Sequence, residues 1–460
     1  MRRVLAATAT LVLAASVTAD AATRHVIRGA GFGHGIGMSQ FGAKGLADNG
    51  RNYKQIVTHY YQGTDVTSAG SRTVRVLLQS GRSEVQFTEA TRAPGKSLSP
   101  NRTYRAHARG LSQVELRTAG GKLVGVFDAP LRVSSSAGVL RLRGTTINGI
   151  REGQFRNSLE IRPGVFGGLG AVNALPLDEY VKGVVPGEVP ASWHMETLKA
   201  QALAARSYTL ATNRGGDAFD QYPDTRSQVY RGFGGEHPRT NQAVDETRGE
   251  IITYRGEVIR AAYYFSTSGG RTENVENVFY NAEPTPYLTS VKDPYDKASP
   301  RHRWRFGFTT GQMQAKLSGL VKGRFKRIDV IKRGESPRVV WANVVGTRGS
   351  TRVRGATLRT KLGLYDTWLH YSRVRTSARK SAFSPEFVAR LLGRRAIVGE
   401  IRPVPRSRRI VVERLDRRGR WVKRLTARTT RKGVYRIILR KPGRFRVRAG
   451  RVIGPTVRVR

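Results

Sequence analysis

One glutamate stands where a carboxyl group could take part in proton transfer. Glu188 lies in the stretch VVPGEVPASW, between Pro186 and Pro190. Because proline has no amide hydrogen, we expect an exposed turn here and not part of a strand ladder. Neighbouring valines and Trp193 make the setting apolar, and burial there would raise the carboxyl pKa toward neutrality. A carboxyl that stays protonated can act as a general acid at a glycosidic oxygen, whereas a solvated surface glutamate would have no such role.

Two further stretches concentrate polar groups or flexible backbone. Residues 266–274 read STSGGRTEN, and their hydroxyls, with Arg271 and Glu273, could hydrogen-bond a sugar. Residues 29–45 read GAGFGHGIGMSQFGAKG, where glycines alternate around His34. Glycine weakens strands but lets the backbone approach a partner closely. We expect these glycines to admit a bulky polymer, with His34 either lining a groove or buried as an organiser of the loop.

Other common kinds of site find no support in the sequence. The chain has no cysteine, which excludes disulfides and thiolate metal sites. Its eight histidines show no HExxH arrangement, and no serine lies in a G-x-S-x-G elbow. The glycine-rich segment lacks the context of a dinucleotide loop. We therefore expect no metal and no cofactor.

Hydrophobic periodicity predicts a mixed α+β protein. A helix is expected over 51–64, ending at Gly63, and an all-β stretch from 73 to 162. Leu177–Val185 should be a strand or short helix ending at Pro186, and Ser192 should cap the following helix. One face of that helix should be lined by Met195, Leu198, Ala202 and Ala205. Strands are expected again in 249–267 and 326–366.

The C-terminal part differs in character from the rest. Residues 372–398 are polar and basic, and the alternating segments after them predict a small all-β sandwich without a catalytic grouping. The expected organisation is a signal peptide at 1–21, a mixed catalytic domain at 22–375 with a β-rich insertion at about 72–165, a basic linker at 376–398 and the sandwich at 399–460. The sandwich should serve as a binding or spacing module.

Composition and charge indicate an exported protein that attracts polyanions. The 460 residues include 81 Lys and Arg against 33 Asp and Glu, for a net charge of +48. Nucleic acid, anionic wall polymers and lipid head groups are candidate partners, and an Arg-rich solvated surface is the alternative. No nucleic-acid-binding signature is visible. Arg2-Arg3, a short apolar run and Ala19-Asp20-Ala21 predict a cleaved signal, with an uncleaved anchor as the alternative; no later segment is apolar enough to span a membrane.

Several long motifs together resemble the SpoIID/LytB-domain family. They are LPLDEYVKGVVPGEVPASWHMETLKAQALAARSYTL, YYFSTSGGRTENVENVF, PYLTSVKDPYD and GFGHGIGMSQFGAKGLADNGRNYKQIVTHYYQGT, within about 29–370. In that family the GHGxGMSQ motif usually closes the domain, whereas here it opens it, which resembles a circular permutation. Some members carry a zinc site with cysteine ligands, but the corresponding stretch DTRSQVYRG has none.

The resemblance implies action on peptidoglycan. It implies lytic cleavage of the MurNAc–GlcNAc bond with a 1,6-anhydro product, and it places the catalytic glutamate of the GE[MV]P motif at Glu188. The residues expected to bind substrate are His34, Gln40, Gln201, Arg206, Tyr230, Ser268, Gly270, Arg271, Thr272 and Glu273.

Two functions of different classes follow from the resemblance. The first is a secreted lytic transglycosylase. The second is a non-catalytic wall-binding enhancer of an N-acetylmuramoyl-L-alanine amidase. Expected partners are glycan strands, anionic wall polymers and, for the second function, a wall amidase; specific DNA binding is not expected of an exported chain.

Overall fold

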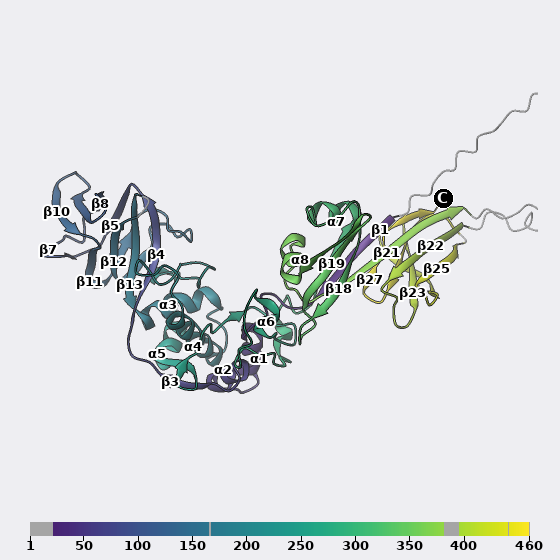
Figure 1. The fold of residues 1–460 in the computed structure, drawn as a ribbon, viewed down its shortest axis with the longest axis horizontal. Helices are drawn as coiled ribbons and strands as arrows, with labels where there is room; N and C mark the ends of the chain where they lie inside the picture. Colours follow the sequence, from purple (N-terminus) through teal and green to yellow (C-terminus); the bar gives the residue numbers. More distant parts are fainter. Residues whose placement is uncertain (1–21, 165–166, 381–394, 440, 460) are drawn as a thin grey trace, which may run out of the picture.

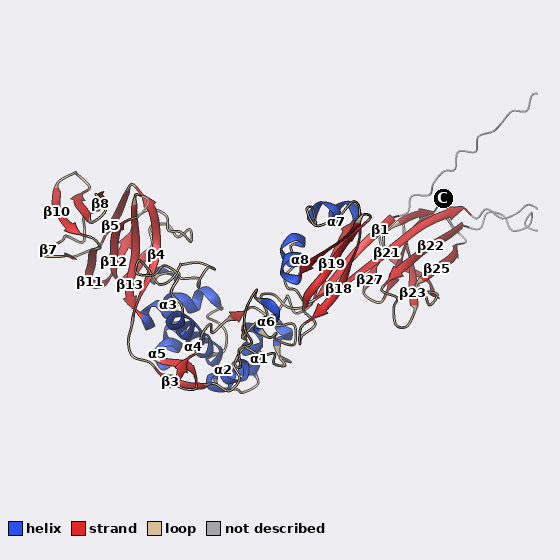
Figure 2. Cartoon of the chain, in the orientation of Figure 1, coloured by secondary structure: helices blue, strands red, loops and turns tan. Residues whose placement is uncertain are grey.

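The computed structural model describes residues 22–164, 167–380, 395–439 and 441–459. The predicted signal peptide therefore lies outside the described residues, as does much of the predicted linker. The molecule is elongated, with a β-rich body at one end, helices in the middle and further sheets at the other end (Figure 1). Helices and strands are both abundant (Figure 2), which confirms a mixed α+β protein.

The β-rich insertion is one antiparallel sheet with its own core. Its main path runs β10-β9-β8-β5-β11-β12-β13-β4, and small strands β6 and β7 join at β11. Apolar residues alternate inward along the strands, so Phe87, Leu140 and Leu159 are fully buried. The stretch extends beyond the expected end at 162 to Pro176. The strands are β4 (Thr73–Arg82), β5 (Glu84–Thr88), β6 (Arg92–Ala93), β7 (Lys96–Ser97), β8 (Tyr104–Arg109), β9 (Gln113–Thr118), β10 (Leu123–Asp128), β11 (Leu131–Leu142), β12 (Gln154–Pro163) and β13 (Leu169–Pro176).

The helical middle is built around one alanine-rich helix. This helix, α4, packs against four other helices and the β14 strand, and it is buried on nearly every face instead of the one face expected. Small side chains such as Ala200 and Ala204 permit these close approaches. The elements are α1 (Gln40–Asp48), α2 (Tyr53–Tyr60), α3 (Leu177–Glu188), α4 (Met195–Ala211), α5 (Pro238–Glu246) and the sheet of β3 (Asp65–Ser68), β14 (Glu250–Tyr254) and β15 (Glu257–Val258).

Two local expectations in this region are wrong. Helix α3 does not end at Pro186 but continues to Glu188. The proline lies in the last turn, where a missing amide hydrogen leaves a single helical bond unmade. The cap of α4 is His194, whose side chain accepts from Glu196 N, while Ser192 is exposed. The helix over 53–60 confirms the one expected at 51–64.

A third body follows the helices. Its antiparallel sheet β18-β19-β20 carries α7 and α8, and its core contains Met313, Leu358 and Leu362. A short parallel pair, β2 with β16, links the glycine-rich segment to the helical middle. The elements are β2 (Met38–Ser39), β16 (Tyr264–Phe265), α6 (Val275–Val278), β17 (Trp304–Thr309), α7 (Thr310–Lys316), β18 (Phe325–Arg333), β19 (Val339–Gly346), β20 (Gly349–Arg354) and α8 (Gly355–Leu362).

The C-terminal sandwich is not a separate module. One of its two sheets has the order β17-β1-β21-β22-β25, so it contains the first described strand of the chain. Figure 1 shows β1, in purple, among green and yellow strands. Along β1, Ile27 faces the third body and Val26 faces the sandwich core. The strands are β1 (Ala22–Gly29), β21 (Leu369–Lys380), β22 (Arg395–Arg402), β23 (Arg409–Leu415), β24 (Trp421–Arg428), β25 (Val434–Leu439), β26 (Gly443–Ala449), β27 (Val452–Ile453) and β28 (Val457–Val459).

The predicted linker at 376–398 is corrected at both ends. Strand β21 runs to Lys380, β22 begins at Arg395, and the two pair with each other in antiparallel register. Residues 381–394 between them lie outside the described residues. Within the described ranges, no helix is long and apolar enough to cross a membrane.

Candidate functional site

Glu188 is the last residue of α3. The helix end is held from a distant segment, because Arg231 N donates to Gly183 O at 2.9 Å. The Glu188 side chain is half-buried. It therefore lies on a fixed helix end, not on the exposed turn that the flanking prolines suggested.

The carboxyl group has two hydrogen-bond partners from other segments. Its Oε1 accepts from Val229 N at 2.8 Å, and the Tyr264 side chain is within hydrogen-bonding reach. Burial raises the pKa of Glu188, although the Val229 amide bond, the Tyr264 bond and nearby Arg231 act in the opposite direction. The net direction favours a protonated carboxyl at higher pH than an exposed glutamate would allow.

The hydroxyl of Tyr264 can donate its hydrogen in two directions. It lies 2.9 Å from Gln228 Oε1. The Gln228 amide nitrogen donates to Thr209 Oγ1 at 2.8 Å, which leaves the amide oxygen as an acceptor for Tyr264. When Tyr264 donates to Gln228, its oxygen can accept a hydrogen bond from protonated Glu188; when Glu188 is ionised, Tyr264 can donate a hydrogen bond to it. Both protonation states of Glu188 are thereby satisfied, which suits a group that gives up and takes back one proton.

Gln40 joins the glycine-rich segment to the Glu188 helix. Its Nε2 donates to Gln201 Oε1 at 3.2 Å and to the backbone oxygen of Glu188 at 3.4 Å. Gln201 is fully buried, and its own amide nitrogen has no partner in the described part of the chain. These contacts place the glycine-rich segment beside Glu188, although 148 positions separate Gln40 from it in sequence.

An aromatic pair and a polar cavity lie near this carboxyl. The rings of Phe41 and Trp193 meet edge to face at 4.9 Å between centroids. A cavity of about 940 Å³ is lined by residues 147–154 of the insertion and by Val229 and Arg231. Because Val229 N also holds Glu188, the carboxyl and this cavity share one wall.

The space beside the alternating glycines is occupied by other segments of the same protein. A Cβ on Gly35 would lie 2.5 Å from Arg338 Nε, and one on Gly37 would lie 2.1 Å from Tyr263 O. Both residues have positive φ, which only glycine adopts without strain. The expectation that these glycines make room for a polymer is therefore corrected, because the space beside them is already filled.

His34 is held inside this loop. Its Nδ1 accepts from Ile36 N at 3.0 Å and its Nε2 lies 3.1 Å from Tyr264 O. Aromatic rings, including Phe265 at 5.3 Å between centroids, surround it. Burial lowers the pKa of His34 to about 4, so the ring is neutral at physiological pH. These contacts match the alternative of a buried organiser of the loop, and a direct role toward substrate stays a prediction.

Arg338 ties the two predicted loops together. Its guanidinium is 1% exposed, bonds to both oxygens of Asp366 at 3.0 and 2.9 Å, and donates to the backbone oxygens of Ser268 and Arg271. A buried ion pair of this kind fixes geometry more than it adds stability. Arg338 thus positions the 266–274 loop against the glycine-rich segment.

Three predicted substrate-binding residues of the 266–274 loop are turned inward. Ser268 donates to Asp293 Oδ2 at 2.7 Å, and Thr272 Oγ1 accepts from Val291 N at 2.8 Å. Glu273 is 0% exposed and accepts from the backbone nitrogens of Glu335 and Ser336. The structure corrects all three to a structural role, because their polar groups already have protein partners.

The remaining predicted residues divide in the same way. Arg206 is 0% exposed and donates to Asp178 and to the backbone oxygen of Glu250. Tyr230 is 1% exposed and donates to Asn173 at 2.7 Å. Both residues are therefore corrected to structural roles. Gly270 has open space where a Cβ would lie, and Arg271 is partly exposed with Nε on Ser290. For these last two, substrate binding stays a prediction.

A zinc site does not fit the residues present. The stretch DTRSQVYRG has no cysteine, and no group of three or more His, Cys, Asp or Glu side chains able to hold a metal occurs among the described residues.

Sequence reasoning missed Tyr264 and Gln228. Tyr264 lies in a stretch that was predicted only as a strand. Gln228 lies in DTRSQVYRG, which was considered only because it lacks the cysteines of a zinc site. The available signal was alternation on β16, where Phe265 faces His34 and Tyr264 must therefore point to the other side.

The matched family model covers the part of the chain that contains Glu188, Gln228 and Val229. Residues 166–254 match the family model described as SpoIID, stage II sporulation protein. Proteins named stage II sporulation protein D from Bacillus amyloliquefaciens and Bacillus subtilis (strain 168) are each 34% identical over 220 residues, which is 44% of this chain and 62% of the relative. A B. subtilis protein named amidase enhancer is 40% identical over 143 residues, which is 31% of this chain and 19% of the relative. The chain thus spans less than two thirds of the length of each of these relatives.

Proposed function

Because the chain belongs to the SpoIID family through residues 166–254, we propose that it is a lytic transglycosylase acting on peptidoglycan. It cleaves the bond between MurNAc and GlcNAc and leaves a 1,6-anhydro end. One observation carries the proposal: Glu188 is a half-buried carboxyl at a fixed helix end, its pKa is raised by burial, and both of its protonation states have hydrogen-bond partners.

A single carboxyl is sufficient for this chemistry. Glu188 donates its proton to the glycosidic oxygen as the bond to the MurNAc anomeric carbon breaks. The ionised carboxylate then accepts the proton of the MurNAc C6 hydroxyl as that oxygen attacks the anomeric carbon. The nucleophile is tethered to the reacting sugar, so proximity replaces the second carboxylate and the water of an ordinary glycosidase.

The surroundings of Glu188 supply the other functions. Tyr264 exchanges its hydrogen bond between Glu188 and Gln228 as the proton leaves and returns. The Phe41–Trp193 pair offers an aromatic surface to the apolar face of a sugar ring. We further propose that the protein is exported, with residues 1–21 removed; N-terminal sequencing of the natural product gives Met1 if this is wrong.

The direct test is the chemical nature of the product. The purified chain is incubated with glycan strands stripped of stem peptides, and the fragments are examined by mass spectrometry. New 1,6-anhydro ends, lighter by one water than hydrolytic ends, support the proposal. Hydrolytic ends, or none, contradict it.

The match to an amidase enhancer favours one alternative. On this alternative the chain binds the wall and stimulates an N-acetylmuramoyl-L-alanine amidase without cutting glycan. Release of stem peptides by a wall amidase, measured with and without the chain, tests it. Stimulation by wild type without any anhydro ends would establish the enhancer function and reject the transglycosylase.

A further inference from the structure

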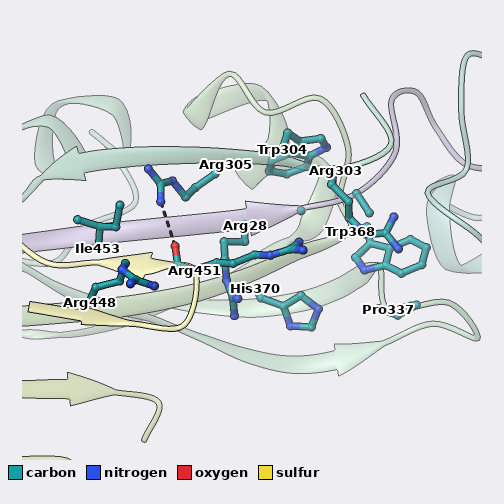
Figure 3. A pocket seen from close by; sticks show the side chains of 12 residues that line it. Arg28, Arg303, Trp304, Arg305, Pro337, Trp368, His370, Arg448, Arg451 and Ile453 are labelled. Carbon is teal, nitrogen blue, oxygen red and sulfur yellow. Dashed lines mark hydrogen bonds between the residues drawn. The ribbon is translucent and has the colours of Figure 1, made fainter. Parts of the chain in front are cut away.

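A second cavity lies far from Glu188, where strands β17, β1 and β21 of one sandwich sheet meet strands β26 and β27 of the other. Its volume is about 720 Å³. Figure 3 shows the side chains that line it, most of which come from β1, from the segment around β17, from the start of β21 and from β26 and β27. They include no Asp or Glu. We name it the arginine cleft and define it by Arg28, Arg303, Arg305, Arg448, Arg451 and Trp368.

The strand register forces cations together in this cleft. Arg28 on β1 lies directly opposite Arg305 on β17 and opposite His370 on β21, so the three side chains share one face. Like charges directly opposite each other in a sheet are destabilising. The Nε of Arg28 is buried and has no hydrogen-bond partner in the described part of the chain. The arrangement leaves a cationic group without the anion that would satisfy it.

Two other arginines of the cleft, Arg448 and Arg305, are held in place by protein partners. Arg448 is fixed by Glu413 Oε1 at 2.8 Å, and Arg305 donates to the backbone oxygen of Arg451 at 2.9 Å, the dashed line in Figure 3. Arg451 is exposed, and within the described ranges its guanidinium makes no ion pair. Part of the cationic lining is thus already oriented before a ligand arrives, which lowers the ordering cost of binding.

The cationic lining continues beyond the cleft. A neighbouring cavity of about 630 Å³ shares Arg28 and His370 with it and adds Arg327, Arg333 and Arg373 from β18 and β21. Asp329 also lines this cavity and pairs with Arg327, and Arg373 pairs with Glu400, so of these three arginines Arg333 is the one without an ion pair among the described residues. Two adjoining cavities that share residues suit a chain of several units better than one small ion.

We propose that the arginine cleft binds phosphate groups of an anionic, phosphodiester-linked wall polymer. A guanidinium is planar and presents paired donors that match phosphate oxygens. Trp368 is half-buried, and the guanidinium groups of Arg303 and Arg338 lie 5.7 and 5.6 Å from its ring centroid; its exposed part offers an apolar surface to the sugar or polyol between phosphates. A single-stranded nucleic acid is bound instead through successive aromatic platforms, and the second tryptophan here, Trp304, is buried. The choice of a wall polymer rests on the proposed peptidoglycan function, but the phosphate chemistry does not.

Binding to a defined probe tests the proposal. The full chain is titrated with a short polyglycerol phosphate, free of glycan, and separately with an oligothymidylate, both by calorimetry at low salt. The variant R28Q/R451Q removes two cleft charges. The control R92Q/R102Q removes two charges from exposed arginines of the insertion, at the opposite end of the molecule (Figure 1). Polyglycerol phosphate affinity should fall about tenfold to a hundredfold in the cleft variant and less than about twofold in the control.

The outcomes separate this proposal from its alternatives. Equal losses in both double variants would show a diffuse field instead of a site, and no loss in R28Q/R451Q would also overturn the proposal. Tighter binding of oligothymidylate, lost in the same variant, would assign the cleft to nucleic acid. R451Q alone changes an exposed side chain and keeps the test valid if R28Q prevents folding; it should lose about threefold to tenfold. Because the probe contains no glycan, the binding result does not depend on whether the protein cleaves peptidoglycan.

Discussion

Glu188 and Glu273 both lie in segments that the sequence singles out, but they differ in burial and in the number of hydrogen-bond donors around the carboxyl group. Glu273 is 0% exposed and accepts from five donors, among them three backbone nitrogens. Glu188 is half-buried and has one backbone donor and the movable hydroxyl of Tyr264. Both carboxylate oxygens of Glu273 are occupied by protein donors, whereas the few donors on Glu188 leave its carboxyl able to engage a further partner. The comparison separates a carboxyl that holds the fold from one available for chemistry.

The largest effect is expected for Glu188→Gln. The amide keeps the size of the side chain but cannot deliver a proton, so release of anhydro ends should fall about 10²–10⁴-fold, while glycan binding and thermal stability change little. Glu179→Gln and Glu196→Gln are the controls. They weaken the ion pairs of Glu179 with Arg156 and Lys182 and of Glu196 with Lys199, and the new amide oxygen in Glu196→Gln can still accept from Tyr53 N. Wild-type activity in Glu188→Gln would show that this carboxyl is structural and would remove the difference between the two glutamates.

The next largest effect is expected at the buried ion pair of Arg338 with Asp366, which positions the loop that contains Glu273. Arg338→Leu leaves Asp366 buried without its partner, so the free energy of unfolding should fall by about 3–5 kcal/mol, measured by chemical denaturation. Arg348→Leu, at an exposed position, is the control. Adding Asp366→Leu to Arg338→Leu should recover part of the loss, and additive losses would contradict a direct pair.

Glu273→Gln should lower stability without abolishing the chemistry. Its amide nitrogen would face backbone N–H groups that now donate to a carboxylate oxygen, at a cost of about 1–3 kcal/mol. The measurement is the unfolding midpoint, with Glu283→Gln at an exposed position as control. If Glu273→Gln kept full stability but lost product formation, Glu273 would be the catalytic carboxyl and the comparison would be reversed.

The smallest effect is expected for Tyr264→Phe and appears mainly in the pH profile. The general acid must be protonated, so the rate should fall as pH rises through the pKa of Glu188, which burial raises. Tyr264 donates to the ionised carboxylate and lowers that pKa, so its removal should move the falling limb to higher pH and reduce the rate about threefold to tenfold. An unshifted limb would separate Tyr264 from the proton transfer.

Periodicity and turn residues predicted much of the fold. The β-rich insertion, the helix at 53–60, the alanine-rich helix α4 and the C-terminal strands were all visible, because buried faces repeat every two residues in a strand and every three to four in a helix. The apolar flank of Glu188 also indicated a raised pKa before any geometry was available. The chain's own residue pattern was thus sufficient for element types and for the most informative carboxyl.

Partners across the fold were not predictable in the same way. Periodicity records that a face is buried but not what covers it, so α4 was expected to have one buried face and has several. The polar residues at 268, 272 and 273 looked available for a sugar, but their partners lie in segments that only folding brings near.

The same limit applies to the site and to the domain boundary. Val229 reaches Glu188 across 41 positions and Gln40 across 148. The first described strand joins a sheet with β21 and β22, which turned a predicted linker into paired strands. The sequence alone determined the element types, the charge and the identity of the candidate acid. The tertiary structure decided which glycines face protein and which carboxyl keeps few donors, because hydrogen-bond satisfaction depends on contacts between segments far apart in the chain.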